Sequence, residues 1–346
     1  MRGLLAVMVF VAACSDGDRG MPGDASVGED ADASVSNNLQ PPGPPMIVCP
    51  SGWPETVLAD GHRFCEPWAP DEDTACPAGQ ARFVGSSSCT VVGSACPEGD
   101  LPEGLPADRD VIFVSTSAPA VGRDGTRERP FAGLGEAFSA ASGGEIFALG
   151  KGRHSVAATF PEDTTLWGAC TAETELVAAF VDDATGTISA HSGATVVVQN
   201  LSIFGAQPGF RVEERATLNV QDVIVSGSGL AGAFVLDGTF VADGFVVRDS
   251  APRDGQFGRG LQVQGGGQAE VSRAVFERVR DIAVQVVDSE SSAELSDVAI
   301  RGVRPDGAAD LGRGVETGTG AALVLSRAVI EDVRDTGVFV GGGRAA

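Results

Sequence analysis

The sequence predicts an all-β protein whose C-terminal half is a solenoid of parallel strands. A phrase that reads as a strand, a polar turn and a second strand returns six times in that half. The copies occupy residues 194–205, 216–227, 238–249, 268–276, 292–302 and 321–332. No helical pattern lies inside the repeat, and a period of this length without helices is typical of a β-solenoid.

Two sets of apolar residues indicate how the coils align. One strand position falls, copy by copy, at Val198, Val220, Ala242, Val271, Leu295 and Leu325, with spacings of 22, 22, 29, 24 and 30 residues. A second, shorter strand phrase follows each copy, and its apolar positions are Phe210, Phe234, Leu261, Val284, Val315 and Val338. Because side chains alternate between the two faces of a strand, we expect the second set to stack as one interior column.

The first residues of the chain have the pattern of an export signal. Residues 1–13 carry one Arg and then an unbroken apolar run, which is too short to span a membrane and fits a signal peptide. The run ends in Val11-Ala-Ala-Cys14, which resembles a bacterial lipobox and implies that the thiol of Cys14 is lipidated. We therefore expect an exported chain, anchored to the outer membrane or cell surface through Cys14. The alternative is an ordinary signal peptide that is cut elsewhere.

Two segments separate this signal from the solenoid. Residues 14–45 are rich in Asp, Gly, Ser and Pro, which predicts a disordered acidic tether. Residues 46–110 form a Cys-rich module. With one Cys in the solenoid, the candidates for disulfide bonds are Cys49, Cys65, Cys76, Cys89, Cys96 and Cys170.

An even number of cysteines in an exported chain indicates disulfides, although their spacing leaves the connectivity open. If all six are paired, Cys170 must bond to one cysteine of the module. A metal site is disfavoured, because no CxxC pair occurs and no His lies at ligand spacing. We expect no metal and no cofactor.

Residues 111–155 read as a strand, a glycine-rich turn, a short helix and another strand. Phe131, Leu134 and Phe138 repeat at helical spacing and predict a helix that plugs one end of the solenoid. With the phrases Gly125-Thr126, Pro130-Phe131 and residues 146–150, this segment resembles the start of the right-handed parallel β-helix, or pectate-lyase-like, superfamily. The resemblance implies such a β-helix over residues 111–346, with about eight coils. The Cys-rich module is similar to that of lipoproteins from high-GC Gram-negative bacteria.

Charged residues recur in register along the coils. The series Asn200, Asp222, Gly244, Arg273, Asp297 and Arg327 ends in three members of alternating sign, for which we expect a stacked ion-pair ladder. A second series holds Arg280, Arg304 and Arg334, and Asp281 and Asp335 stand next to two of these arginines. The functional interpretation is a binding ladder that grips an acidic glycan. The alternative is solvation of the turns with local charge neutralisation.

The sequence favours a non-catalytic protein. Lyases of the superfamily resemble one another in holding Ca²⁺ with carboxylates from neighbouring coils, but the outward positions expected here do not place acids on adjacent coils. We assign no catalytic residue. The net charge of −23 argues against a nucleic-acid partner.

We therefore expect a structural or binding element of the cell surface, with a polysaccharide or an envelope protein as partner. The alternative function is a carbohydrate-active enzyme, a lyase or hydrolase acting on acidic polysaccharide. Nothing after residues 337–340 reads as a cap for the last coil, so we also expect end-to-end self-association or fraying there.

Overall fold

The computed structural model describes residues 48–49, 55–57, 61, 63–65, 75–156, 160, 163–179, 185–205, 207–254, 257–306 and 311–345. The expected signal peptide, the lipidated Cys14 and the tether of residues 14–45 lie outside these residues. In the described part of the chain, no helix is long and apolar enough to cross a membrane. The predicted module boundaries at residues 46 and 110 stay predictions.

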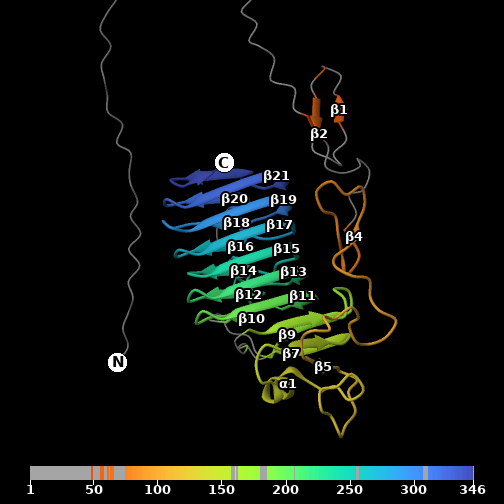
Figure 1. Cartoon of the computed structure of the whole chain (residues 1–346). Helices are drawn as coiled ribbons and strands as arrows, with labels where there is room; N and C mark the ends of the chain where they lie inside the picture. Colours follow the sequence, from red (N-terminus) through yellow and green to blue (C-terminus); the bar gives the residue numbers. More distant parts are fainter. Residues whose placement is uncertain are drawn as a thin grey trace, which may run out of the picture. The chain divides into compact units, whose positions relative to one another are not determined.

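Residues from Val111 onward wind into a parallel β-helix, as the repeat predicts (Figure 1). Each coil contributes a long strand to one sheet and a short strand to a second sheet. The long strands are β11 (Thr195–Phe204), β13 (Thr217–Ser226), β15 (Thr239–Arg248), β17 (Gln268–Glu277), β19 (Ser292–Val303) and β21 (Ala322–Val333). The short strands are β10 (Ile188–Ala190), β12 (Phe210–Glu213), β14 (Ala231–Leu236), β16 (Arg259–Gln264), β18 (Ile282–Val286), β20 (Arg313–Gly318) and β22 (Val338–Gly341).

The expected alignment of the long strands is confirmed. Val198 pairs with Val220, and the pairing continues through Ala242, Val271, Leu295 and Leu325. The polar turn expected inside each phrase is a bend at a single residue, since the strand continues on both sides of it. Interior positions step from Val220 to Val223 across this bend, three residues apart instead of two, because the bent residue turns the chain to the next face of the coil.

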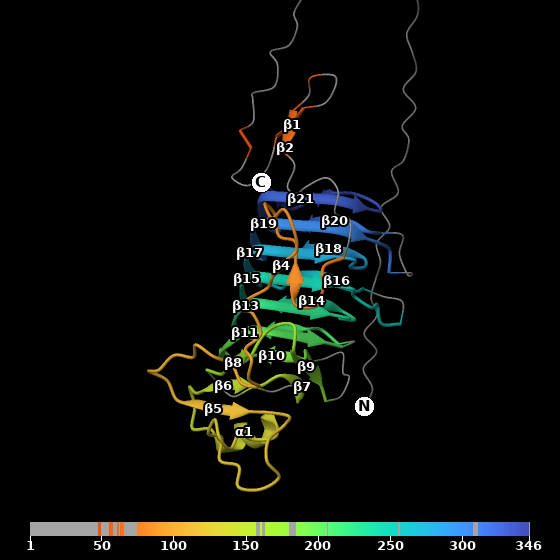
Figure 2. The ribbon, with the colours of Figure 1, turned by 90° about the vertical axis from the view of Figure 1, so that its right-hand side faces the viewer.

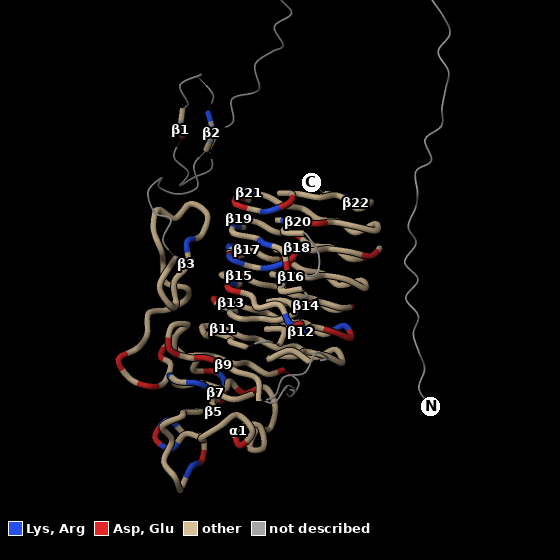
Figure 3. The backbone as a smooth tube through the Cα atoms, turned by 180° about the vertical axis from the view of Figure 1, so that it is seen from behind, with Lys and Arg blue, Asp and Glu red and all other residues tan. Residues whose placement is uncertain are grey.

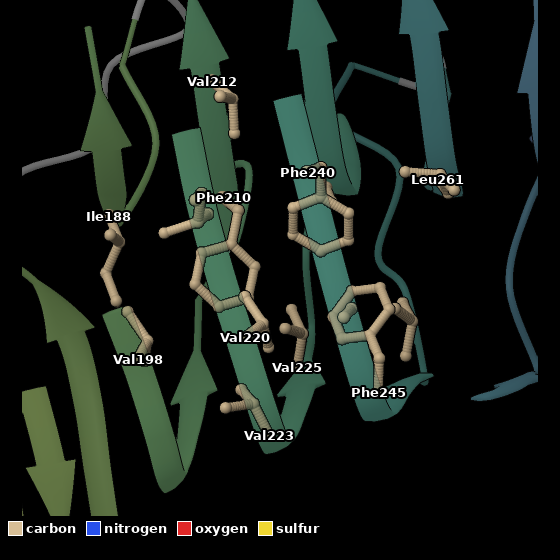
Figure 4. Close-up of a cluster of buried hydrophobic side chains, with 14 of the residues drawn as sticks. Ile188, Val198, Phe210, Val212, Val220, Val223, Val225, Phe240, Phe245 and Leu261 are labelled. Carbon is tan, nitrogen blue, oxygen red and sulfur yellow. The ribbon is translucent and has the colours of Figure 1, made fainter. Parts of the chain in front are cut away.

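The alignment of the short strands is wrong at one coil. Phe210 pairs with Ala233, not with Phe234, and Ala233 then pairs with Leu261. The rings of Phe210, Phe240 and Phe245 meet in the interior (Figure 4). Their centroids lie 5.3 to 6.1 Å apart, and the small side chain of Ala233, the partner of Phe210 on the next strand, is fully buried.

One member of the expected interior column therefore lies elsewhere, and another stays in register with Val315 but is exposed. Phe234 lies on the outer face, where the guanidinium of Arg211 covers its ring at 5.0 Å. The side chain of Val338 belongs to the last coil and is 45% exposed. Phe210, Leu261, Val284 and Val315 are fully buried, as expected.

The N-terminal end of the solenoid is closed by the predicted helix. This helix, α1 (Leu134–Ala140), is shorter than the apolar pattern suggested, and Phe131 precedes it in a β-bridge with Val114. Leu134 and Ala137 are buried, and Phe138 makes edge-to-face contacts with Phe147 and Phe160. The helix contacts two of the first strands, β5 (Val111–Val114) and β7 (Gly152–Val156). The other strands at this end are β6 (Ile146–Leu149), β8 (Thr165–Gly168) and β9 (Thr174–Ala178).

All six cysteines of the expected disulfide set are paired. The bonds are Cys49–Cys65, Cys76–Cys89 and Cys96–Cys170. The first bond brackets the hairpin of β1 (Glu55–Val57) and β2 (Arg63–Cys65), and the second brackets the pair β3 (Gln80–Ala81) and β4 (Thr90–Val91). The third confirms that Cys170 bonds to the module. These bonds indicate an exported protein.

The module packs along the side of the solenoid, which the sequence reading did not anticipate. The segment that contains β4 crosses several coils (Figure 2). Its buried residues Ala81, Phe83 and Val92 contact an outward column of the long strands. That column consists of Ile224, Val246, Val275, Ala299 and Val329.

Charged side chains border this contact. Glu277 is almost fully buried and lies between Arg248 and Arg301, at 3.8 and 3.6 Å, in register on the neighbouring strands. Arg248 also donates a hydrogen bond to the carbonyl of Gln80, and Arg301 donates one to the carbonyl of Arg82. Burial lowers the pKa of both arginines, and the charge of Glu277 opposes that effect. The alternating charges therefore tie the module to three consecutive coils.

Candidate functional site

A network of polar side chains that joins several coils lies on the outer face of the short-strand sheet. Gln262, Gln285 and Glu316 occupy equivalent outward positions on β16, β18 and β20. Arg259 and Arg313 begin the strands β16 and β20. We call these five residues, together with Asp281 and Asp335, the short-strand ladder. Positive and negative segments are interleaved on these coils (Figure 3).

Two arginines of the short-strand ladder each bond to several of its side chains, and we call them hubs. Arg259 is the first. Its Nε donates a hydrogen bond to Oδ2 of Asp281 at 2.5 Å, on the next coil. Its Nη1 donates to Oε1 of Gln262 at 3.0 Å and to Oε1 of Gln285 at 2.6 Å. The ring of Phe257 lies 4.8 Å from the guanidinium. One arginine thus joins two coils through hydrogen bonds to three side chains.

Arg313 is the second hub, two coils further on. It donates hydrogen bonds of 2.7 Å to Glu316 on its own strand and to Asp335 on the next coil. The Phe339 ring lies 4.0 Å from its guanidinium carbon. Burial lowers the pKa of Arg313, but its bonds to Asp335 and Glu316 outweigh this and raise the pKa overall. A hydrogen bond of 3.2 Å from Gln285 to Glu316 joins the two hubs.

Asp281 is the most enclosed carboxylate of the short-strand ladder, with 3% of its side chain exposed. Burial raises its pKa, and the charges of Asp306 and Glu316 add to that rise, while Arg259 opposes it. Asp306 also accepts a hydrogen bond from the backbone N–H of Phe257, at 2.9 Å. Three carboxylates from two neighbouring coils therefore lie close enough to influence one another.

The predicted arginine series lies in the turns beside this ladder. Arg280 and Arg304 form a parallel β-bridge, and the backbone N–H of Arg334 donates to the carbonyl of Val303, so the series is stacked in register. Arg304 forms a bidentate ion pair with Asp332 at 2.7 Å. Arg280 and Arg334 are exposed, and neither guanidinium has an ion-pair partner among the residues that the structure describes. Asp281 and Asp335 bond to Arg259 and Arg313 instead of to the adjacent arginines.

The other predicted series marks the bends of the long strands. All six members have positive φ, and their values run from 49° to 70°. Asp297 and Arg327 form a bidentate ion pair at 2.7 Å. Arg273, however, reaches across Gly244 to Asp222 at 2.6 Å and bonds to Asp243 at 2.7 Å. The expected alternating ladder therefore consists of two separate groups.

Gly244 permits this contact with Asp222. A Cβ at residue 244 would lie 2.3 Å from Oδ1 of Asp222 and 2.4 Å from Nη2 of Arg273. The Arg273 guanidinium also lies 4.9 Å from the ring of Phe83, in the docked module. This charged group therefore belongs to the module contact.

The side chains of the short-strand ladder can form hydrogen bonds to a ligand, but they are poorly placed to transfer a proton to it. Each carboxylate named in it already accepts a hydrogen bond from an arginine. A general acid or base must reach the substrate, and Asp281 is nearly inaccessible. Within the described ranges, no group of three metal-ligating side chains has the geometry of a metal site.

The sequence analysis did not single out Arg259 or Arg313, although both stand in a recurring sequence phrase. Arg259 and Arg313 each stand in a Gly-Arg-Gly phrase, residues 258–260 and 312–314. Gly258 and Gly312 have φ values of 91° and 129°, which an L side chain rarely adopts. The repetition of this phrase two coils apart marks a shared local geometry.

Comparison with known proteins assigns no family and no function to the chain. No protein-family model matches the chain, and no curated protein matches it. Among solved structures, it is similar to a rhamnogalacturonan lyase, with 11% identity and a TM-score of 0.38 over 68% of this chain and 62% of that one. It is also similar to a variant catalytic domain of a GH87 α-1,3-glucanase in complex with nigerose, with 11% identity and a TM-score of 0.32 over 70% and 46%. The chain spans less than two thirds of either structure.

Proposed function

We propose that this chain is a non-catalytic, lipid-anchored surface protein whose β-helix is a rigid binding element for acidic glycans of the envelope. The observation that supports the proposal is the contrast between the short-strand ladder and the arginine series beside it. The carboxylates of the ladder are held by arginines, whereas Arg280 and Arg334 are exposed in register. Among the described residues, this surface therefore offers two exposed guanidinium groups, and each carboxylate of the ladder is already bound by an arginine.

The chemistry of the arginine series suits an anionic polymer. A guanidinium binds a carboxylate or sulfate through two parallel hydrogen bonds. Stacked coils place equivalent residues about 4.8 Å apart, so Arg280 and Arg334 present donors two coils apart, on either side of Arg304, which is held by Asp332. Because the whole chain is strongly acidic, binding depends on this local row, and we expect it to weaken with salt.

A direct binding measurement tests this function. We expect the purified protein to bind oligogalacturonate on an array or by calorimetry, and to bind a neutral cello-oligosaccharide far more weakly. Arg280→Ala should reduce the affinity about tenfold, whereas Arg215→Ala, at an exposed turn on the other side of the coils, should leave it unchanged. Equal affinities for the two glycans, or equal effects of the two substitutions, would count against the proposal.

The anchor rests on the lipobox resemblance of residues 11–14. We expect the protein to enter the detergent phase on phase partitioning and Cys14→Ser to move it to the aqueous phase. A Ser variant that still partitions into detergent would remove the anchor from the proposal.

A carbohydrate-active enzyme is the second candidate, and one observation favours it. Burial raises the pKa of Asp281, and the charges of Asp306 and Glu316 on the next coil add to that rise, as expected for a general acid near other carboxylates. Release of unsaturated uronate or of reducing ends from acidic polysaccharide, abolished by Asp281→Asn, would establish this function. No turnover with retained binding would support the non-catalytic one.

A further inference from the structure

A shallow groove crosses the outward face of the long strands, before the bend in each strand. It consists of two adjoining hollows of about 310 and 290 Å³, and Val241 and Glu270 line both. One row of outward positions crosses the groove in register from β15 to β21. This row reads Val241, Glu270, Glu294 and Val324. Two acids therefore lie between two apolar side chains, and we call this surface the acidic groove.

The two acids of the groove are not neutralised within the described part of the chain. Glu270 and Glu294 are exposed, and neither has an ion-pair or hydrogen-bond partner among the described residues. They are direct neighbours on β17 and β19, where like charges destabilise a sheet. Glu277 of the same sheet, by contrast, lies between Arg248 and Arg301. The pair at 270 and 294 is therefore a cost to the fold that a bound cation would remove.

The turns beside the acidic groove have the same sign of charge. The turns between the short strands and β13, β15, β17 and β19 hold one base, Arg215, and four exposed acids, which are Glu214, Asp237, Asp288 and Glu290. The arginine series lies in the other turns, which lead from the long strands to the short ones. The two turn regions of the coils therefore suit ligands of opposite charge.

We propose that the acidic groove binds a cationic segment of a partner protein. Lys or Arg side chains of the segment contact Glu270 and Glu294, and apolar side chains on either side of them pack on Val241 and Val324. At about 4.8 Å per coil, the row is about 14 Å long, which suits a polymer better than a single ion. Ca²⁺ takes oxygen ligands, which the two valines do not offer, and the described residues hold no group with the geometry of a metal site. The net charge of −23 attracts a cationic partner from a distance. This inference is independent of the proposed glycan binding.

Calorimetric titration of the purified full chain with a synthetic peptide tests the proposal. The peptide carries two adjacent arginines between leucines, and the control peptide carries neutral citrulline in place of arginine. We expect the arginine peptide to bind, more weakly as salt is added, and the citrulline peptide to bind at least about tenfold more weakly. Glu270→Gln combined with Glu294→Gln should lower the affinity for the arginine peptide about tenfold. Glu103→Gln combined with Glu128→Gln is the matched control, because it removes the same charge from exposed residues outside the groove.

Denaturant unfolding distinguishes a lost contact from a damaged fold. Without peptide, the groove variant should be at least as stable as the unsubstituted protein, because the substitutions remove a repulsion between like charges. Absence of binding, equal binding of the two peptides, or an equal loss of affinity in the two variants would overturn the proposal. Saturable binding of Ca²⁺ that the groove variant loses, without any binding of the peptide, would assign these acids to a metal ion instead.

Discussion

Asn200 of the solenoid and Ser94 of the module exchange two hydrogen bonds. The backbone N–H of Ser94 donates to Oδ1 of Asn200 at 3.0 Å, and Nδ2 of Asn200 donates to Oγ of Ser94 at 2.8 Å. Nδ2 also lies 2.9 Å from the carbonyl of Gly168. Because Asn200 has a φ of 57°, one residue both bends β11 and fixes the module to it.

Asn200→Ala should destabilise the protein by about 2 to 3 kcal/mol, because it removes these bonds and places Ala in a left-handed conformation. Asn219→Ala, on an outward position of β13, should cost less than about 0.5 kcal/mol. Denaturant unfolding of both variants checks the difference. Equal costs would show that Asn200 contributes little to the module contact.

The covered and uncovered parts of β15 should lose different amounts of stability when Val is replaced by Lys. Val246 is fully buried under the module, whereas Val241 lies on the same strand before the bend at Gly244 and is only partly covered. Val246→Lys should cost at least about 3 kcal/mol, since it buries an unpaired charge, and Val241→Lys should cost less than about 1 kcal/mol.

Limited proteolysis of residues 79–94 reports on the same pair of variants. We expect cleavage in Val246→Lys and protection in Val241→Lys. Protection in both variants would contradict the packing of the module on this column.

The corrected alignment of the short strands predicts unequal costs for two Phe to Ala changes. Phe240 is fully buried among Phe210 and Phe245, and its truncation should cost about 3 to 5 kcal/mol. Phe234 lies outside under Arg211, and its truncation should cost about 1 to 2 kcal/mol. Thermal or denaturant unfolding measures both. A larger loss for Phe234→Ala would restore the original alignment.

Stability should fall in mild acid through His154. Its ring is buried, and its Nε2 lies 2.8 Å from the carbonyl of Gly150. Burial lowers the pKa of His154, although the Gly150 carbonyl and the charge of Asp100 partly oppose this. The unfolded chain therefore takes up a proton more readily than the folded one. The stabilisation is complete above pH 6.5, the ordinary pKa of histidine, and is lost as the pH falls through the lower folded value.

The free energy of unfolding against pH checks this expectation, with His154→Gln as the comparison. The glutamine variant should show a flatter profile below pH 6.5, because Gln keeps an amide donor but does not titrate there. Parallel profiles for the two proteins would assign the acid sensitivity to other groups.

The long strands could be predicted from sequence because the same phrase returns in each coil, with its apolar positions in register around one recurring bend position. The short strand at Ala233 and Phe234 could not, since residues 231–236 have no polar position to distinguish the faces. Packing decides the register there, through rings that come from residues 240 and 245.

The sequence contains a signal for the docking of the module, but the segment that docks is distant in the sequence. Residues 223–225, 245–247 and 274–276 are each apolar at three consecutive positions, which is typical of a strand buried on both faces. The candidate site was less predictable. Asp281 and Asp335 stand next to Arg280 and Arg334 in the sequence, but they bond to Arg259 and Arg313 of the preceding coil. The geometry of the turns determines this pairing.

The contact between module and solenoid also orders events during synthesis. An exported chain emerges from its N-terminus, so the module appears first, and the surface on which it docks is complete only when Val275 and Ala299 have followed. Until then, the side chains of Phe83 and Val92 have no apolar surface on which to pack. Cys170 emerges well before that surface does, and its bond to Cys96 can hold the waiting segment beside the coils as they form. The Cys96–Cys170 bond therefore keeps the module close to the surface on which it docks. An apolar segment that is held close to its docking surface is exposed for less time while the chain is incompletely folded and prone to aggregate.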